Sequence, residues 1–255
     1  MPPARSAPIE ELVAASGRQR FVVMRAVVGA GDAELHPDEL RLTTAMSQRR
    51  LATFTAGRAA AAAALGALGE PPSPVTIGTG GAPQWPTGIV GSISHTDTTA
   101  YAIVGLAEPS ETGTHVAVGI DVEQRGRIEP EMIPSIMTGA EQRLWASLSD
   151  TDADRFATLV FSAKEALYKA QFALTRSWLG FEHVTLANLE PPSSLGTATH
   201  PIRADLVETP SSPLAELAIE RPICVRSLVS VNEVISVVVL RRPVSSDPTS
   251  QARPR

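Results

Sequence analysis

The segment FSAKEALYKA, residues Phe161 to Ala170, lies in the middle of a stretch whose apolar residues recur at helical spacing. This spacing predicts a helix from about Asp154 to Leu174. At 100° per residue, one stripe of that helix carries only alanine and leucine, so we expect it to press on a sheet. The members of the stripe are Leu159, Ala163, Ala166, Leu167, Ala170 and Leu174.

The opposite face of the same helix carries charged residues. Glu165 and Lys169 are four positions apart and therefore lie one above the other, with Lys164 to one side. The simplest interpretation is an ion pair on a solvated helix, worth a few tenths of a kcal/mol. The alternative is a chemically active face, and the choice depends on what lies opposite.

The segment HVAVGIDVE, from His115 to Glu123, alternates with period two and predicts a strand. Asp121 and Glu123 fall on one side of it, roughly 6.6 Å apart along the strand. The residues before them on that side, Ala117 and Gly119, are small and would leave room for a ligand. Two neighbouring carboxylates need a cation or donors unless the strand simply runs out into solvent, which is the alternative.

Composition restricts the class of protein. A chain of 255 residues with 43% hydrophobic residues can form one large domain or two small ones. The net charge of −5 argues against a general binder of nucleic acid or anionic membrane, so any phosphate site must be local. We expect a cytoplasmic protein, because no signal-peptide pattern or run of eighteen apolar residues occurs. The single cysteine, Cys224, is expected to be a buried structural thiol.

The first half reads as strand, helix and hairpin. A helix is expected to start near Pro37 and to continue through Leu68. Gly57 inside it costs about 1 kcal/mol relative to alanine, which suggests a close approach there by backbone or ligand. The expected strands are Phe21 to Val28, Ile89 to Ser94 and Thr99 to Leu106.

The second half repeats this order. Helix is expected from about Pro130, interrupted at Gly139, before the helix that contains Glu165. Residues 190–213 read as a Pro- and Ser-rich excursion, and residues 1–8 and 243–255 as mobile tails. The expected strands are Val184 to Leu189, Ile223 to Val229 and Val234 to Leu240, the last two forming a hairpin.

Four motifs in this order resemble a known family. GIDVE, followed about forty residues later by FSAKEALYK, is similar to the two signature motifs of the Sfp-type 4′-phosphopantetheinyl transferases. In the first half, PQWPTGIVGSISHT (Pro83 to Thr96) and RRLATFTAGRAAAAAAL (Arg49 to Leu65) resemble the branch that includes enterobactin synthetase component D. The resemblance runs from about Phe21 to Leu240.

This resemblance implies an α+β fold of two pseudo-symmetric α/β halves. Each half would be a small, mainly antiparallel sheet packed on a long helix, with the active site in the cleft between the halves. Residues 1–114 would form the N-terminal half and contact coenzyme A phosphates. Residues 115–242 would form the C-terminal half with the metal site, and residues 243–255 a mobile tail.

The resemblance also implies the reaction, which moves 4′-phosphopantetheine from coenzyme A to a serine of an apo acyl or peptidyl carrier protein and releases 3′,5′-ADP. Mg²⁺, which Mn²⁺ can replace, would be held by Asp121, Glu123 and Glu165. Glu165 would also be the base, and Lys169 would neutralise or protonate the leaving phosphate. We further expect a monomer that meets its carrier transiently and binds neither nucleic acid nor membrane.

By the same resemblance, five residues would contact coenzyme A besides Lys169. Arg50 and Arg58 are eight apart on one helix face, and their fork-like donors suit phosphate, although a solvent-facing basic helix is the alternative. Ser94 and His95 would bind the 3′-phosphate of the nucleotide. Lys164 could reach a phosphate only from the side of the site.

The sequence departs from the family pattern at one place. Family members often carry a lysine before the Pro-x-Trp-Pro motif, whereas IGTGGAPQWP has Gly80 at about that position. Coenzyme A binding should then be weaker, or an arginine elsewhere should compensate. After the main helix, an apolar group with Arg176 would suit docking of an acidic carrier, or would only complete the second core.

Two other functions fit the same motifs. A metal-dependent pyrophosphohydrolase of coenzyme A or a nucleotide would use the same groups to present water in place of serine. A non-catalytic coenzyme A-binding protein is the third hypothesis, and the presence of Asp121, Glu123, Glu165 and Lys169 argues against it.

Overall fold

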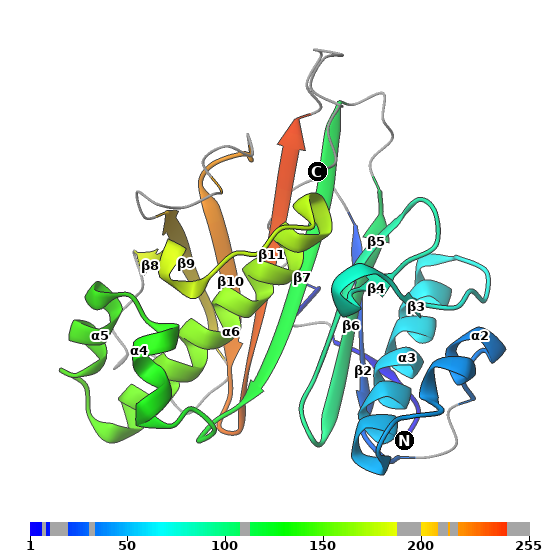
Figure 1. Ribbon diagram of the computed structural model, residues 1–255, viewed down its shortest axis with the longest axis horizontal. Coiled ribbons are helices and arrows are strands. Elements are labelled where there is room, and N and C mark those ends of the chain that lie inside the picture. The colour runs from blue at the N-terminus through cyan, green and yellow to red at the C-terminus, as the bar shows by residue number, and fades with distance from the viewer. Residues whose placement is uncertain are drawn as a thin grey trace.

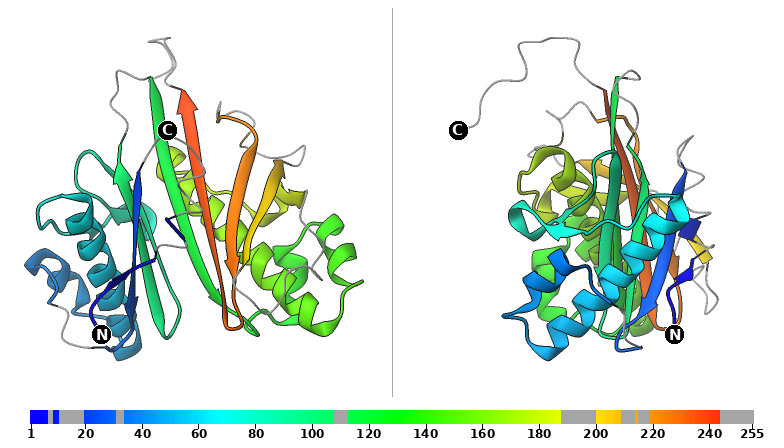
Figure 2. Two further views of the ribbon diagram at one scale, coloured as in Figure 1. Left: turned by 180° about the vertical axis from the view of Figure 1, so that it is seen from behind. Right: turned by 90° about the vertical axis from the view of Figure 1, so that its right-hand side faces the viewer.

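The computed structural model describes residues 1–6, 9–10, 20–30, 34–107, 113–187, 200–208, 214 and 219–243. Two antiparallel sheets stand side by side, and a long helix covers each of them on the same side (Figures 1 and 2). This arrangement confirms the predicted α+β class with two similar halves.

The N-terminal half is a four-stranded sheet in the order β1-β2-β6-β5. Residues Ala4 and Arg5 pair with Arg25 and Met24, so the prediction of a mobile tail is wrong for these two residues. The strands are β1 (Ala4–Arg5), β2 (Phe21–Val27), β5 (Ile89–His95) and β6 (Thr99–Leu106), with a separate small ladder of β3 (Thr76–Ile77) and β4 (Pro83–Gln84).

The long helix of this half is α3 (Gln48–Leu68). The Ser47 side chain caps its start by accepting from the Arg50 amide, and Gly69 with φ of 99° ends it. The predicted single helix from Pro37 is therefore wrong, because α2 (Pro37–Leu40) and η1 (Arg41–Thr43) form a separate turn. Among the described helices, α3 alone is long and apolar enough to cross a membrane, but half of that window is buried in the protein.

The C-terminal half is a five-stranded sheet in the order β7-β11-β10-β9-β8. Its strands are β7 (Thr114–Gln124), β8 (Val184–Ala187), β9 (His200–Glu208), β10 (Ile223–Val229) and β11 (Glu233–Pro243). The predicted closing hairpin of β10 and β11 is confirmed. Strand β9 lies inside the predicted excursion, which is wrong for residues 200–208 because β10 supplies a full-length pairing partner.

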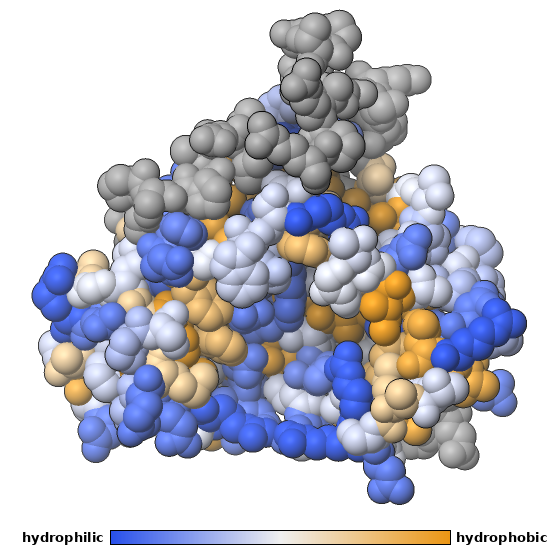
Figure 3. All heavy atoms as spheres, in the orientation of Figure 1, coloured by the Kyte–Doolittle hydropathy of each residue, from blue (hydrophilic) through white to orange (hydrophobic). Residues whose placement is uncertain are grey.

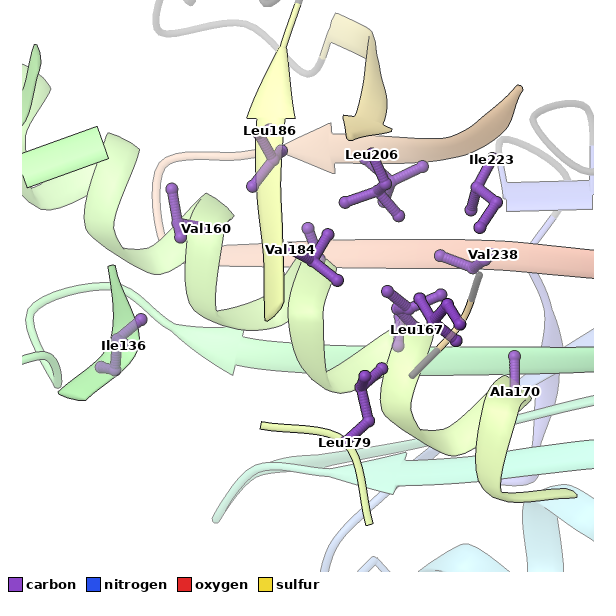
Figure 4. Packing of buried hydrophobic residues seen from close by; sticks show 14 of the residues in the cluster. Ile136, Val160, Leu167, Ala170, Leu179, Val184, Leu186, Leu206, Ile223 and Val238 are labelled. Atoms are coloured by element: carbon purple, nitrogen blue, oxygen red, sulfur yellow. The ribbon is translucent and has the colours of Figure 1, made fainter. Parts of the chain in front are cut away.

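Helix α6 (Asp150–Thr175) covers this second sheet and begins after the cap residue Ser149. Its predicted apolar stripe is confirmed, since Leu159, Ala163, Ala166, Leu167 and Ala170 are buried. Figure 4 shows Val160, Leu167 and Ala170 of α6 among core residues of the strands. The remaining short elements are η2 (Thr79–Gly81), η4 (Pro130–Met132), α4 (Ile133–Ile136), α5 (Gly139–Trp145) and η5 (Phe181–His183).

The two halves meet where β5 and β7 lie side by side (Figure 1). On the side away from the long helices, one buried cluster takes residues from both sheets, including Val23, Ile103, Ile120 and Val237. This shared core fixes the two halves against each other, and the polar residues between them are held in place by it.

Candidate active site

Asp121 lies at the centre of the polar cluster between the halves. Its side chain is only 3% exposed, and its Oδ1 accepts hydrogen bonds from Lys169 Nζ at 2.6 Å and from Ser94 Oγ at 2.9 Å. Among the residues that the structure describes, its buried Oδ2 has no hydrogen-bond partner. A buried, unpaired carboxylate oxygen is costly, so this atom is a place where a cation or donor would bind well.

Gly119 explains why this carboxylate meets helix α6. A Cβ at Gly119 would lie 1.9 Å from the carbonyl oxygen of Ala166, so the backbone of α6 packs directly on β7 at this position. The expectation that Gly119 leaves room for a ligand is therefore wrong, because the helix takes that space. Ala117, on the same side of the strand, does line an open pocket. The close packing brings Lys169 onto Asp121.

Lys169 points across the seam between the halves. Besides Asp121, its ammonium donates to Ser94 Oγ at 3.0 Å and to the carbonyl of Ile120 at 3.3 Å. The ion pair that this lysine forms is thus with a residue of β7, and the simple helical pair with Glu165 is not the arrangement found. Of the two interpretations of this helix face, the solvated Glu165–Lys169 ion pair is not found, and Lys169 belongs to a polar cluster with Asp121 and Ser94.

Glu123 and Glu165 are half-buried beside this pair. Burial, then the charge of Asp121, raises the pKa of Glu123 to about 7. Burial also raises the pKa of Glu165, Lys169 opposes the rise, and Asp121 adds to it. The three carboxylates therefore interact electrostatically, and a bound cation would relieve their repulsion.

The three carboxylates do not form a finished metal cage. Within the described part of the chain, no three acidic, histidine or cysteine side chains lie close enough together to hold a metal ion as they stand. The predicted ligand set of Asp121, Glu123 and Glu165 is brought into one electrostatic group. The side chains would have to close on a metal.

Lys164 does not lie in this cluster, which corrects the expectation that it contacts a phosphate. Its ammonium is buried, and it donates to Glu141 Oε2 at 2.7 Å and to the carbonyls of Ile136 and Phe181, each at 3.0 Å. All three of its N–H donors are used in this way. Lys164 therefore connects α6 to α4, α5 and η5 in the interior of the protein. An unpaired ammonium at this buried position would be strongly destabilising.

A second group of cationic side chains gathers against α3. Arg50, Arg58 and His95 line a pocket of about 120 Å³ together with Phe54 and Gly57. The two arginines are thus on one helix face, as the sequence predicts, and they face a pocket and not only solvent. Arg50 Nη1 lies 2.9 Å from His95 Nε2. Burial, then Arg50 and Lys169, lowers the pKa of His95, so the neutral ring can accept this bond.

Arg58 is nearly buried in the wall of this pocket. Its guanidinium lies over the ring of Phe54 at 4.3 Å, and the nearest carboxylate oxygen, on Glu39, is 4.0 Å away. Burial lowers the pKa of Arg58 to about 10, and its buried Nε lacks a partner among the described residues. A poorly compensated guanidinium beside a cavity favours an anion such as phosphate.

Ser94 and His95 point to opposite sides of β5, as successive strand residues must. His95 faces Arg50, whereas Ser94 is bonded to Asp121 and Lys169. The two side chains thus have different partners, and the expectation that both contact one phosphate stays a prediction. Ser94 belongs to the carboxylate cluster.

A larger pocket of about 350 Å³ opens between the halves. Its lining comes from several of residues 80–93 in the N-terminal half, and from residues 116–118 and several of residues 168–176 in the C-terminal half. Lys169 and Trp85 are among its walls. On this face of the molecule, hydrophilic residues line the hollow between the halves (Figure 3). The larger pocket shares Gly81, Pro83 and Ile93 with the cationic pocket, so the two are neighbours with a common wall.

The structure also explains Gly80. Its φ of 67° favours glycine, and a Cβ there would lie 2.7 Å from Phe172 Cζ. The aromatic ring thus takes the space that a side chain at this position would need. Arg176, at the end of α6, lines the same pocket and lies 5.7 Å from the Phe172 ring.

Comparisons with known proteins agree with this arrangement. Residues 38–105 match the family described as the 4′-phosphopantetheinyl transferase N-terminal domain, and residues 117–208 match the 4′-phosphopantetheinyl transferase superfamily. The chain is 35% identical to 4′-phosphopantetheinyl transferase Npt of Nocardia iowensis, over 66% of this chain and 73% of that protein. The chain belongs to the 4′-phosphopantetheinyl transferases.

This transferase is also similar to two further proteins. It is 37% identical to 4′-phosphopantetheinyl transferase PptT of Mycobacterium tuberculosis, over 58% of this chain and 64% of that protein. It is 36% identical to enterobactin synthase component D of Salmonella typhimurium, over 65% of this chain and 62% of that protein. The matched segments thus cover less than two thirds of these two relatives.

Two acidic partners of arginines in this region are not indicated by the sequence. Glu39 is buried beside Arg58 and also accepts from the Val75 amide at 2.8 Å, although HPDEL reads only as a helix start. Asp97 pairs with Arg49 at 2.6 Å and with Arg127 from the other half. These partners come from distant segments, so no local pattern indicates them.

Proposed function

We propose that this transferase moves 4′-phosphopantetheine from coenzyme A to a serine hydroxyl of an apo acyl or peptidyl carrier protein and releases 3′,5′-ADP. The observation that carries the proposal is the position of Lys169, which pairs with Asp121 and lines the larger of two neighbouring pockets. The smaller pocket is cationic, and the carboxylates adjoin the pair. Such an arrangement suits a long ligand that has a phosphate at one end and its reactive phosphates in the middle.

Coenzyme A fits this pair of pockets in one direction. Its 3′-phosphate would lie in the pocket of Arg50, Arg58 and His95, where the buried Nε of Arg58 has no hydrogen-bond partner among the described residues. The pantetheine arm would extend along the larger pocket. The pyrophosphate would then lie next to Lys169. In this orientation Arg176 stands where it could partly replace the missing family lysine.

The carboxylates fit Mg²⁺ as the cation of this site. Mg²⁺ takes oxygen ligands, usually from one or two carboxylates together with substrate phosphates and water. Asp121 offers an unpaired buried oxygen, and Glu123 and Glu165 are half-buried carboxylates whose mutual repulsion a cation would relieve. Bound Mg²⁺, or Mn²⁺ in its place, would neutralise the pyrophosphate. An open ligand set suits a metal that arrives together with the substrate.

The protein groups then have separate roles in the transfer. Glu165 takes the proton of the carrier serine, and its raised pKa keeps it basic enough for this task. The serine oxygen forms a bond to the phosphorus that bears pantetheine, and the bond from that phosphorus to the bridging oxygen breaks. Lys169 donates to the leaving phosphate of 3′,5′-ADP.

The carrier would approach the rim of the larger pocket at the end of α6. There Trp178 is 76% exposed and contacts Tyr168 edge-on at 5.3 Å, and Arg176 is also exposed. An exposed tryptophan beside an arginine suits an acidic helical partner, such as a carrier of polyketide, nonribosomal-peptide or siderophore synthesis. We place this activity in the cytoplasm, on a monomer.

The experiment is to incubate the protein with coenzyme A, Mg²⁺ and a panel of apo-carriers and to weigh the intact carriers. A carrier that gains one phosphopantetheine, with an equal amount of 3′,5′-ADP, supports the proposal. Excess chelator should stop the transfer, and Mg²⁺ or Mn²⁺ should restore it. Formation of 3′,5′-ADP without a modified carrier would favour the hydrolase, and full transfer in chelator would contradict the metal assignment.

A further inference from the structure

Ser94 is the residue through which the N-terminal half touches the carboxylate cluster. It belongs to β5, and its hydroxyl donates to Asp121 Oδ1 at 2.9 Å. Ser94 Oγ in turn accepts from Lys169 Nζ at 3.0 Å and from the amide of Val122 at 3.3 Å. A serine hydroxyl has one donor and two acceptor positions, so all three are used.

Two interactions satisfy backbone groups on the edge of β7 that faces β5. The amide of Val122 is satisfied by Ser94 from the N-terminal half, and the carbonyl of Ile120 by Lys169 from α6. Ser94 itself is buried, so water does not compete well for these bonds. Lys169 and Asp121 are therefore held between the two halves by one hydroxyl group.

The next residue, His95, belongs to the other pocket. It faces Arg50 on the opposite side of β5. Two neighbouring residues of one strand thus serve two different sites, and substitutions at them should separate coenzyme A affinity from turnover.

We propose that Ser94 is a positioning residue that aligns Lys169 and Asp121 for the transfer and that it makes no contact with coenzyme A phosphate. The rate effect rests on the proposed function, whereas the contact itself does not. Through this hydroxyl the N-terminal half contributes to the reaction step as well as to binding. A displacement of about 1 Å in such a group can cost roughly 10²-fold in rate.

The first test compares Ser94→Ala with His95→Ala, with Ser227→Ala as the matched control. Ser227 is another buried strand serine, whose hydroxyl contacts only Ser236 among the described side chains. We expect Ser94→Ala to lower the single-turnover rate at saturating coenzyme A by about tenfold or more. Its dissociation constant for coenzyme A should stay within about twofold of the wild type. His95→Ala should show the reverse pattern, and Ser227→Ala neither effect.

The second test does not depend on activity. Unfolding midpoints are measured for Ser94→Ala and for Lys169→Met, alone and combined, in a double-mutant cycle. If Ser94 holds Lys169, the shift caused by Ser94→Ala should fall to about half or less in the Lys169→Met background. The shift caused by Ser227→Ala should be the same in both backgrounds. Additive shifts for Ser94 would overturn the proposal.

The remaining outcomes are also decisive. A normal rate for a folded Ser94→Ala variant would overturn the proposal. So would a loss of coenzyme A affinity in this variant that is absent when dephospho-coenzyme A is the ligand. If Ser94→Ala fails to fold, Ser94→Thr, which keeps the hydroxyl, should retain both the rate and the coupling to Lys169. A wild-type protein without transfer activity would refute the proposed function, and the unfolding cycle would still decide the contact.

Discussion

The two long helices pack on their sheets in different ways. In the N-terminal half the glycine is on the helix: a Cβ at Gly57 of α3 would meet only the Ile93 side chain, at 3.1 Å. In the C-terminal half the glycine is on the strand, and a Cβ at Gly119 would meet the backbone of α6 at 1.9 Å. Helix α6 therefore lies directly on β7, whereas α3 leaves a side-chain layer between itself and β5.

This difference separates two kinds of site. The spaced contact of α3 leaves a pocket of about 120 Å³ between arginines and strand, which suits binding of a phosphate. The close contact of α6 places a lysine 2.6 Å from a buried carboxylate, which suits chemistry at a fixed point. In our proposal one half serves mainly affinity and the other the reaction, with Ser94 as the link.

The largest expected effect tests the reaction side. Glu165→Gln keeps the size and one oxygen of the side chain but removes its basicity, so single-turnover transfer should fall by about 10² or more. Coenzyme A and Mg²⁺ affinities should fall only modestly. Transfer at a rate near that of the wild type under saturating metal would mean that another group, such as Glu123, is the base.

Lys169→Ala is the matched comparison on the same helix face. The rate should fall because positive charge is lost beside the leaving phosphate. Mg²⁺ affinity should stay the same or rise slightly, because a cation next to the metal site has gone. Single-turnover rates and calorimetric metal titration of both variants separate the two roles. A large loss of metal affinity in Lys169→Ala would contradict this division.

The two glycines give a smaller effect, on stability. Gly119→Ala forces a methyl group against the Ala166 carbonyl and should lower the free energy of unfolding by about 1–3 kcal/mol. Gly57→Ala meets only a side chain, and it gains about 1 kcal/mol of helix propensity that offsets the contact. Chemical denaturation measures both. Equal destabilisation by the two substitutions would refute the contrast between the helices.

The remaining prediction concerns the pH dependence of stability. The folded protein raises the pKa of Glu123 from 4.5 to about 7, so the native state binds the extra proton. In chelator, stability should therefore decrease as pH rises from about 4.5 to about 7 and then level off. Glu123→Gln should flatten this slope in thermal unfolding. A steeper slope in that variant would contradict the assignment.

Local patterns were sufficient for the elements that bury one face. The alanine and leucine stripe of α6 and the alternation of β7 both predict the structure correctly, because their period equals that of the element. The same alternation, applied to β5, separates Ser94 from His95. The strand period therefore predicts the separation of these two side chains, which the family motif does not show.

Non-local partners account for the failures. The strand β9 forms because β10 is available to pair with it. The Pro- and Ser-rich sequence around β9 gives no local sign of this pairing. Lys164 turns inward because Glu141, 23 residues earlier, provides a buried carboxylate. Gly119 looked like space for a ligand because the sequence does not show how closely another helix approaches.

One measurement tests the division between binding and reaction most directly: dissociation constants and single-turnover rates of His95→Ala and Glu165→Gln with coenzyme A and with dephospho-coenzyme A. We predict that His95→Ala weakens coenzyme A binding by about tenfold, as expected for loss of a hydrogen bond to a charged group, and changes dephospho-coenzyme A binding little. Glu165→Gln should slow both substrates by the same factor. If His95→Ala impairs both substrates equally, or if the effect of Glu165→Gln depends on the 3′-phosphate, the two sites are not divided in this way.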